Sequence, residues 1–537
     1  MTNTKGIIFG GALICGLVIY ITVIFVGTSE DNDYKLYYNK DKLNHFQHLK
    51  TIKQYKEHGV KVDKTSSLSE DESIAEMQKS LSNFPIEFWY RNKNKSMKMN
   101  KTCALFPSLL DIEYNNNYWQ TLRTSQDVTF HLYGAYFDNR EKNLLGPTVR
   151  ILSMINLKNT TVKTHCQFWF ENKNEPVIVP STEYRFVWFL DWGVQKQGTF
   201  EPHLIACVLP ENVKNIVPKS VSLVEKYCDT AKNNMKVYNN KPEEKKDFAV
   251  CVKGMDFLKS DLSVKLAEWI ELLHLLGADK TFFYILNVHP NITKILNYYE
   301  QQGKIEVNPI SLAGVSPNAP LLQHYYLKNK VFHKRQQELI PYNDCFYRHM
   351  YEYKYIILLD TDEVIMPIKA MNWSSLIEKV LPEARIKFNN DPSTLTVQNT
   401  FFLDYFLDSH GYFTEIPTYM HMMQHVYRSR KHTRPGSYAK AFFSTEHVLS
   451  LHNHHPIECL DGCRNFDIRV EDAQLNHYRS SCDSATKKEC DELLKDIVLD
   501  SSIWRYSETL NSNVYNTLNE LGFFENTTIV KKSTNLF

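Results

Sequence analysis

The chain has 537 residues, of which 62 are Lys or Arg and 61 are Asp or Glu, so its formal net charge is +1. This length accommodates roughly three to four domains of ordinary size. The balanced charge gives no electrostatic reason to bind nucleic acid or an anionic membrane surface, and we expect no nucleic-acid partner.

The N-terminus carries an apolar segment that follows Lys5 and is long enough to span a bilayer. We expect an uncleaved transmembrane anchor at 6–28, because the run is long and Gly27-Thr-Ser-Glu30 is a poor cleavage site; a cleaved signal peptide is the alternative. Positive charge precedes the segment and acids follow it. The positive-inside rule then keeps residues 1–5 cytosolic and sends the rest of the chain across the membrane.

Two further features agree with a body in an oxidising lumen. Acceptor sequons for N-glycosylation occur at Asn94, Asn100, Asn159, Asn291, Asn372 and Asn526. Of the 11 Cys residues, Cys15 lies in the predicted anchor, which leaves an even ten outside it. We expect these ten mostly as disulfides, whose pairing cannot be deduced from the sequence.

Residues 29–95 are polar and Lys-rich, which predicts a stem that is partly helical or disordered. Residues 96–240 carry short β-branched and aromatic runs without helical periodicity, which predicts a small β-sandwich-like domain. Its expected strands are 127–133, 148–152, 165–170, 184–190 and 204–209. A Lys-, Asn- and Glu-rich stretch at 229–247 marks the boundary to the next domain.

From Phe248 onwards strand and helix signals alternate, which predicts a parallel sheet with right-handed crossovers. The apolar residues between 262 and 276 have the spacing of a helix with one buried face, and Gly277 is placed to end it. The other elements are expected as strands at 248–252, 280–286, 304–307 and 355–359 and as helices at 291–302 and 343–352. We therefore predict an α/β domain at 245–510, with a C-terminal tail at 511–537.

The last of these strands ends abruptly in Asp360-Thr-Asp362-Glu363. Ligands of such sheets lie outside the carboxyl ends of the strands, where these acids are delivered. In an extended chain Asp360 and Asp362 would point to the same side. Two hard oxygen ligands suit a divalent cation that also holds a diphosphate, and an acidic turn without a metal is the alternative. For Glu363 a catalytic role and a salt bridge to a helix both stay open.

Further candidates lie late in the chain, in His477-Tyr478-Arg479. His477 suits a third metal position and Arg479 suits diphosphate oxygens, although a purely structural histidine is the alternative. Upstream of them, Glu471 and Asp472 are candidates for a general base that deprotonates an acceptor hydroxyl. Acids at the start of a helix would have the same pattern.

A histidine-rich zone raises zinc as an alternative. Its members are His421, His425, His432, His447, His452, His454 and His455. The zinc signal is weak, because the chain has neither His-Glu-x-x-His nor Cys-x-x-Cys. Cys459, Cys463, Cys482 and Cys490 match a zinc set by number, but a lumen favours disulfides. The motifs of serine hydrolases, P-loop enzymes and Rossmann oxidoreductases are also missing.

An ordered set of short strings resembles glycosyltransferase family 92 over roughly residues 100–480. The strings are Tyr133-Gly-Ala-Tyr-Phe-Asp138-Asn-Arg140, Cys251-Val252, Glu268-Trp-Ile-Glu271, Leu276-Gly277, Tyr284, Asn343-Asp344-Cys345 with Arg348, Asp360-Thr-Asp362-Glu363 with Pro367, and His477-Tyr478-Arg479. Each string is weak by itself, and their order makes the set fairly specific. The Cys459–Cys463 loop and the tail after Asn511 match no family string, and we interpret them as acceptor-specific additions.

The resemblance implies a GT-A catalytic domain with a mostly parallel sheet and flanking helices, in a single-pass type II protein of the Golgi membrane. It implies inverting transfer of a hexose, galactose from UDP-galactose, onto N-glycan core fucose or galactose of a glycoprotein or glycolipid. Mn²⁺ or another divalent cation would be held by Asp360, Asp362 and His477. We expect the nucleotide sugar to contact Asp360, Arg479 and the strand end Cys251-Val252-Lys253.

Two questions stay open at this level. Asp404 joins Glu471 and Asp472 as a candidate base, since spacing selects none of the three. The alternative function is a catalytically silent luminal ectodomain that binds a glycan or a partner protein, which predicts no metal-dependent binding of UDP.

Overall fold

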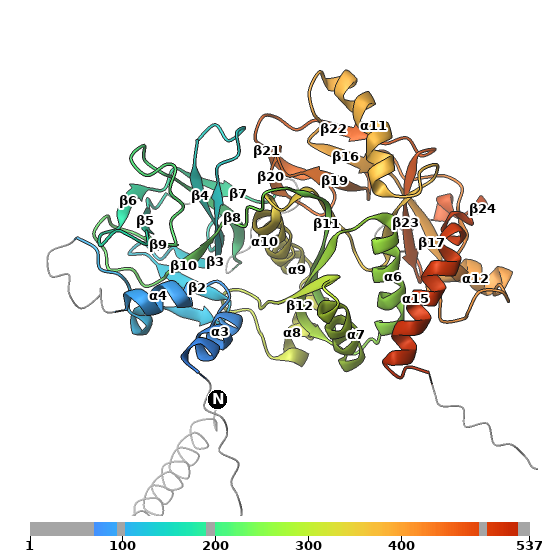
Figure 1. Cartoon of the computed structure of the whole chain (residues 1–537), viewed down its shortest axis with the longest axis horizontal. Coiled ribbons are helices and arrows are strands. Elements are labelled where there is room, and N and C mark those ends of the chain that lie inside the picture. Colours follow the sequence, from blue (N-terminus) through green and yellow to red (C-terminus); the bar gives the residue numbers. More distant parts are fainter. Residues whose placement is uncertain (1–68, 94–102, 160, 190–198, 483–490, 525–537) are drawn as a thin grey trace, which may run out of the picture. The chain divides into compact units, whose positions relative to one another are not determined.

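Figure 1 shows the computed structural model, which describes residues 69–93, 103–159, 161–189, 199–482 and 491–524. The predicted anchor at 6–28 lies outside these residues. None of the helices in the described ranges has both the length and the apolar character needed to cross a membrane. By compactness the chain divides into two units, and the second, Ile74–Phe537, contains both large sheets and the three-stranded sheet described below.

The first large sheet belongs to the region predicted as β-rich, and all five expected strands are present. Its strands are β1 (Tyr114–Asn116), β2 (Trp119–Arg123), β3 (Thr129–Asp138), β4 (Thr148–Ile155), β5 (His165–Trp169), β6 (Val177–Pro180), β7 (Glu183–Phe186), β8 (Glu201–Val208), β9 (Ser220–Val224) and β10 (Met235–Tyr238). Their order is β6-β5-β9-β10-β3-β4-β8-β7, with β2 beside β3. A disulfide joins Cys166 of β5 to Cys207 of β8, two strands that are not neighbours, so the sheet curls over its own core.

Short helices precede this sheet, at α3 (Glu70–Ser80), α4 (Ile86–Asn92) and the 3₁₀ turn η1 (Leu109–Asp111). Phe84, Ile86 and Phe88 are buried. Phe88 packs edge-on against Phe106, which packs in the same way against Trp169 of β5. The last part of the predicted stem therefore belongs to the folded body, because its aromatic residues find apolar partners on the sheet.

The second large sheet has the order β13-β12-β11-β14-β19-β16-β22. Its strands are β11 (Lys246–Phe257), β12 (Lys280–Val288), β13 (Ile305–Pro309), β14 (Tyr353–Leu358), β16 (Thr394–Val397), β19 (Lys440–Ser444) and β22 (Asn465–Asp467). The first four in this order are parallel, as predicted, whereas β19 is antiparallel to both of its neighbours. The sheet is therefore mixed, with its parallel part formed by the predicted alternation of strands and helices.

The helices around this sheet are α6 (Ser263–Leu276), α7 (Pro290–Gln301), α8 (Pro320–Asn329), α9 (Val331–Gln337), α10 (Leu339–His349) and α11 (Trp373–Phe388). Gly277 ends α6 as predicted, with φ of 107°, a left-handed conformation that glycine adopts without steric cost. Figure 1 shows α6 and α7 beside the strands β11 and β12. Trp269 of α6 and Phe283 of β12 are both fully buried, so the predicted apolar face of α6 is the face that packs on the sheet.

A three-stranded sheet stands beside the large one, in the order β15-β23-β17. Its strands are β15 (Glu363–Pro367), β17 (Asn399–Leu403) and β23 (Ala473–Arg479), with β23 antiparallel to β15 and parallel to β17. The remaining elements are α12 (Asp404–His410), α13 (His421–Gln424), β18 (Tyr427–Ser429), β20 (Val448–Leu451), β21 (Pro456–Cys459), β24 (Ile497–Leu499), η3 (Ser502–Tyr506) and α15 (Ser507–Glu520).

Helix α15 extends into the predicted tail. Leu510, Val514 and Leu518 lie on one side of it and are buried in the same core as α6. Thr517 accepts a hydrogen bond from Tyr299 of α7 at 3.2 Å. The packed body therefore continues beyond residue 510, and the residues of the predicted tail up to 520 are part of it.

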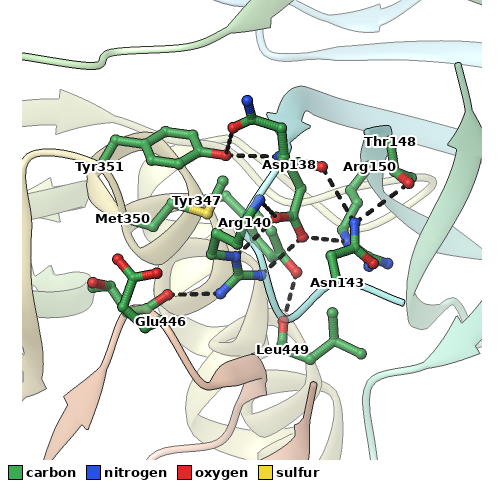
Figure 2. A network of polar contacts seen from close by, with 12 residues as sticks. Asp138, Arg140, Asn143, Thr148, Arg150, Tyr347, Met350, Tyr351, Glu446 and Leu449 are labelled. Carbon is green, nitrogen blue, oxygen red and sulfur yellow. Dashed lines mark hydrogen bonds and ion pairs between the residues drawn. The ribbon is translucent and has the colours of Figure 1, made fainter. Parts of the chain in front are cut away.

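A buried network of charges connects the first sheet to the second part of the chain (Figure 2). Asp138 accepts hydrogen bonds from Arg140 and from Arg150, each at 2.8 Å, and all three side chains are 1% exposed or less. Arg140 also donates to the carbonyl oxygens of Thr445 and Val448, at 2.8 and 2.6 Å. The Asp138-Asn-Arg140 string is therefore a structural junction.

Candidate active site

The acidic string forms the turn between β14 and β15, at the carboxyl ends of the parallel strands. The backbone N–H of Glu363 donates to the carbonyl oxygen of Asp360 at 3.0 Å, which closes the turn. The prediction of an extended segment is therefore wrong. The two aspartates differ in environment instead, since the side chain of Asp360 is 21% exposed and that of Asp362 is 48% exposed.

Asp360 is surrounded by cationic groups. Nζ of Lys253 lies 3.0 Å from Oδ1 of Asp360, and Nζ of Lys440 lies 3.5 Å from Oδ2. Burial acts to raise the pKa of Asp360, but the two ammonium groups hold this pKa well below its usual range. Asp360 is thus firmly ionised, and its charge is already compensated. This fits an indirect contact with a cation, or a contact with a ribose, better than direct coordination.

Glu363 is almost fully buried and supports the turn from within. Its Oε2 lies 2.8 Å from Nζ of Lys440 and accepts a hydrogen bond from the backbone N–H of Asp360 at 3.0 Å. Burial raises the pKa of Glu363 in spite of the lysine. The salt bridge that was one of its two predicted roles is therefore formed, but with a strand, β19, in place of a helix.

Asp362 and His477 face each other at the open side of the turn. Strand β23 pairs with β15 so that His477 is opposite Glu363. Nε2 of His477 lies 3.6 Å from Oδ2 of Asp362, which is longer than a hydrogen bond. Nδ1 of His477 is buried without a hydrogen bond. Nε2 of His477 and the exposed carboxylate of Asp362, at this separation, form a donor set that fits a divalent cation.

The structure separates the predicted nucleotide contacts. The sulfur of Cys251 is bonded to Cys345 of α10, and the side chain of Val252 is 1% exposed, so both side chains belong to the core. Lys253 is the member of this trio that reaches the acidic turn. Arg479 lies two residues beyond His477 on β23 and hence on the same face of the strand.

The three candidate bases lie at different ends of β23. Asp472 precedes this strand at the end opposite His477, where it is buried and paired with Lys379 and with Arg469. Glu471 is exposed beside it. Asp404 follows β17, whose last residue is opposite Arg479 in the parallel pairing. The topology therefore brings Asp404, and neither Glu471 nor Asp472, to the end of β23 that carries His477.

Lys440 is the site residue that sequence reasoning missed. Its side chain is fully buried, between Asp360, Glu363 and the amide oxygen of Asn453. It begins β19, and the antiparallel pairing of β19 with β14 places it beside the acidic turn. No local pattern marks it, because a lysine at the start of a strand is usually exposed. Only the pairing of two distant strands assigns its position.

Comparison with known protein families gives a match over the second half of the described body. The sequence profile of glycosyltransferase family 92 matches residues 246–514, which spans the second large sheet, the acidic turn and β23. A search of curated proteins found no matching relative.

Proposed function

The chain belongs to glycosyltransferase family 92, and from this premise we propose that it transfers galactose from UDP-galactose onto a glycan acceptor, with inversion at the anomeric carbon. The observation that supports a working site is the pair Asp362 and His477. Asp362 is half exposed and lies 3.6 Å from Nε2 of His477, and Nδ1 of His477 is buried without a hydrogen bond, whereas Asp360 and Glu363 are each paired with a lysine. Such a contrast is typical of a ligand site, since an unpaired polar group costs stability unless a ligand completes it.

We propose Mn²⁺, or another divalent cation, as the cofactor. Asp362 and His477 would coordinate it directly, and Asp360 would contact it indirectly or contact the ribose. When bound, the cation would offset the charge of the diphosphate as the bond between sugar and phosphate breaks. Its fit rests on the donor set, because Nε2 of His477 lies 3.6 Å from Oδ2 of the exposed Asp362 carboxylate.

The chain's own residues have separable tasks in this proposal. Lys253 and Lys440 keep Asp360 ionised and fix the turn, so that Asp362 keeps its orientation before any ligand arrives. Arg479, on the same face of β23 as His477, is suited to bind diphosphate oxygens. We retain Asp404 as the candidate base for the acceptor hydroxyl, because it alone of the three candidates lies at this end of β23.

We further propose a single-pass type II protein of the Golgi membrane that is anchored through residues 6–28. The acceptor would be core fucose or galactose on an N-glycan or a glycolipid. Four disulfides among the described residues support an oxidising compartment. Glycan profiling of cells that lack the protein tests donor and acceptor together, because a lost structure identifies both.

Calorimetric titration of the full chain with UDP tests the site itself. We expect binding that requires Mn²⁺ and is lost in Asp362→Asn, together with galactose transfer or UDP-galactose hydrolysis that disappears in the same variant. Activity that survives Asp362→Asn would overturn the metal assignment. Absence of UDP binding with and without Mn²⁺ would favour the silent ectodomain.

A further inference from the structure

A second group of ligand-type side chains includes Asp404 and shares no residue with the acidic turn. Asp404 begins α12, His421 begins α13, and His425 follows its last residue. One ligand atom from each of the three lies within 4.8 Å of the other two. The two histidines are four residues apart on one helical turn, so their rings lie side by side with centroids 4.0 Å apart.

The imidazole of His425 is oriented for a ligand. The side chain is buried, and its Nδ1 donates to the carbonyl oxygen of His421 at 2.6 Å. A carbonyl only accepts, so Nδ1 carries a proton, and in the neutral imidazole the lone pair is then on Nε2. Nε2 makes no hydrogen bond, although it lies 2.9 Å from Oδ1 of Asp404. A lone pair and a carboxylate oxygen this close repel unless a proton or a cation lies between them.

The backbone between the two histidines is fixed by hydrogen bonds to a buried carboxylate. Glu268 of α6 is fully buried, and its carboxylate accepts hydrogen bonds from the backbone N–H groups of Met422 and Met423, at 2.9 and 3.0 Å. These two residues lie between the histidines. A turn fixed in this way keeps the ligand atoms in place before a cation binds, as supporting hydrogen bonds do in metal sites.

The two histidines of the group border a pocket with a volume of about 320 Å³. His421 and His425 line it together with Asp261, Tyr412 and Tyr419, so a fourth coordination position has room for water or a small ligand. Lys265 also lines this pocket, and its Nζ lies 3.5 Å from Nε2 of His421. This ammonium group opposes a cation, so its removal should strengthen cation binding.

We propose that Asp404, His421 and His425 bind one Zn²⁺, in a site separate from that of Asp362 and His477. Two imidazoles and one carboxylate with an open position are a donor set of zinc centres, whereas Mn²⁺ prefers oxygen ligands. The site depends on neither the donor sugar nor the transfer reaction. If zinc binds, Asp404 is a zinc ligand and its assignment as a free base fails.

The test measures zinc directly, on the full chain stripped of metal and then saturated with Mn²⁺ to fill the acidic site. We expect one equivalent of Zn²⁺ by elemental analysis and by competition with a chromophoric chelator. His425→Ala and His421→Ala should each weaken this binding by more than the roughly 10–100-fold that loss of an outer-shell partner causes. Asp362→Asn is the matched control and should retain the zinc, which separates this inference from the proposed function.

Two further measurements guard against a folding artefact. Lys265→Met, which removes no ligand, should bind Zn²⁺ more tightly than the wild type, because one positive charge beside His421 is gone. Co²⁺ in place of Zn²⁺ should give the visible spectrum of a tetrahedral site, and His425→Ala should lose it. Equal zinc content in the wild type and His425→Ala, with both chains folded, overturns the proposal and leaves Asp404 and His425 as an ion pair only.

Discussion

Asp138 and Asp362 belong to two clusters of charge that differ in whether they are closed. Asp138 is 0% exposed, and two guanidinium groups occupy both of its oxygens. Asp362 is half exposed and has a histidine nitrogen 3.6 Å away. A cluster whose carboxylate oxygens are all occupied by protein groups has no position for a ligand and stabilises the fold, and we call it closed. A cluster with an unoccupied carboxylate oxygen can bind a ligand at some cost in stability, and we call it open. Mutations in the two clusters should therefore affect different properties.

The largest effect is expected for Asp138→Ala. It leaves the side chains of Arg140 and Arg150 charged and buried without their common partner, which should lower the free energy of unfolding by about 3–5 kcal/mol. Chemical denaturation measures this change. Asp362→Asn is the matched control and should shift the same quantity by less than about 0.5 kcal/mol, as a substitution at an exposed site. Equal losses in the two variants would remove the distinction between closed and open clusters.

Asp362→Asn should act on catalysis. We expect a fall in kcat/KM of about 10²–10³-fold, or about 2.7–4 kcal/mol, comparable to the loss of one preorganised group that stabilises charge in a transition state. Steady-state assays with UDP-galactose at several Mn²⁺ concentrations measure it. Higher Mn²⁺ should restore part of the activity if Asp362 binds the cation. Rescue by added metal would not occur if Asp362 only stabilised the turn.

The disulfide between Cys251 and Cys345 connects β11 to α10 beneath the active site. The double variant Cys251→Ala/Cys345→Ala should lose about 2–4 kcal/mol of stability. Its KM for UDP-galactose should stay unchanged at a temperature where it is folded, because the sulfur of Cys251 belongs to the core. A large rise in KM without loss of stability would return Cys251 to the nucleotide site.

The smallest effect is an acid-dependent one at Asp138. Burial acts to raise the pKa of Asp138, but Arg140 and Arg150 hold it well below the value near 3.9 of an unfolded chain. Its contribution is therefore present above about pH 4 and is lost as the pH falls below that, by at most about 1.4 kcal/mol per pH unit. Between pH 5 and pH 3 the free energy of unfolding should decrease less steeply with falling pH in Asp138→Asn than in the wild type. Parallel pH profiles of variant and wild type would contradict this.

Much of the fold followed from local patterns. The alternation from Phe248 onwards predicted β11, α6, β12, α7 and β13, and Gly277 marked the end of α6. These predictions hold because burial of one helix face and of a covered strand leaves a periodic trace in the sequence itself. The predictions at Asp360 and in the tail were less accurate. The chain turns at Asp360, whose carbonyl oxygen accepts a hydrogen bond from the backbone N–H of Glu363. Helix α15 packs in the same core as α6 and is hydrogen-bonded to α7.

Part of the candidate site was likewise predicted from the sequence, and part was placed only by the structure. Asp362 and His477 were chosen from residue type and from their place in the family's strings, and the pairing of β15 with β23 brings them together. The sequence could not rank Glu471, Asp472 and Asp404. Only the direction of β23 shows that two of them lie at its far end.

The sequence by itself determined the family, the alternation of helices and strands, and the chemical type of the groups at the acidic edge. All three are local properties, encoded in short strings and in periodic burial. The tertiary structure decided which charged groups are paired with protein partners and which can still bind a ligand. Lys440 joins Asp360 and Glu363 only through the pairing of β19 with β14, and His425 meets Asp404 only through packing. Such partners are distant in the chain, so no local pattern of residues records them.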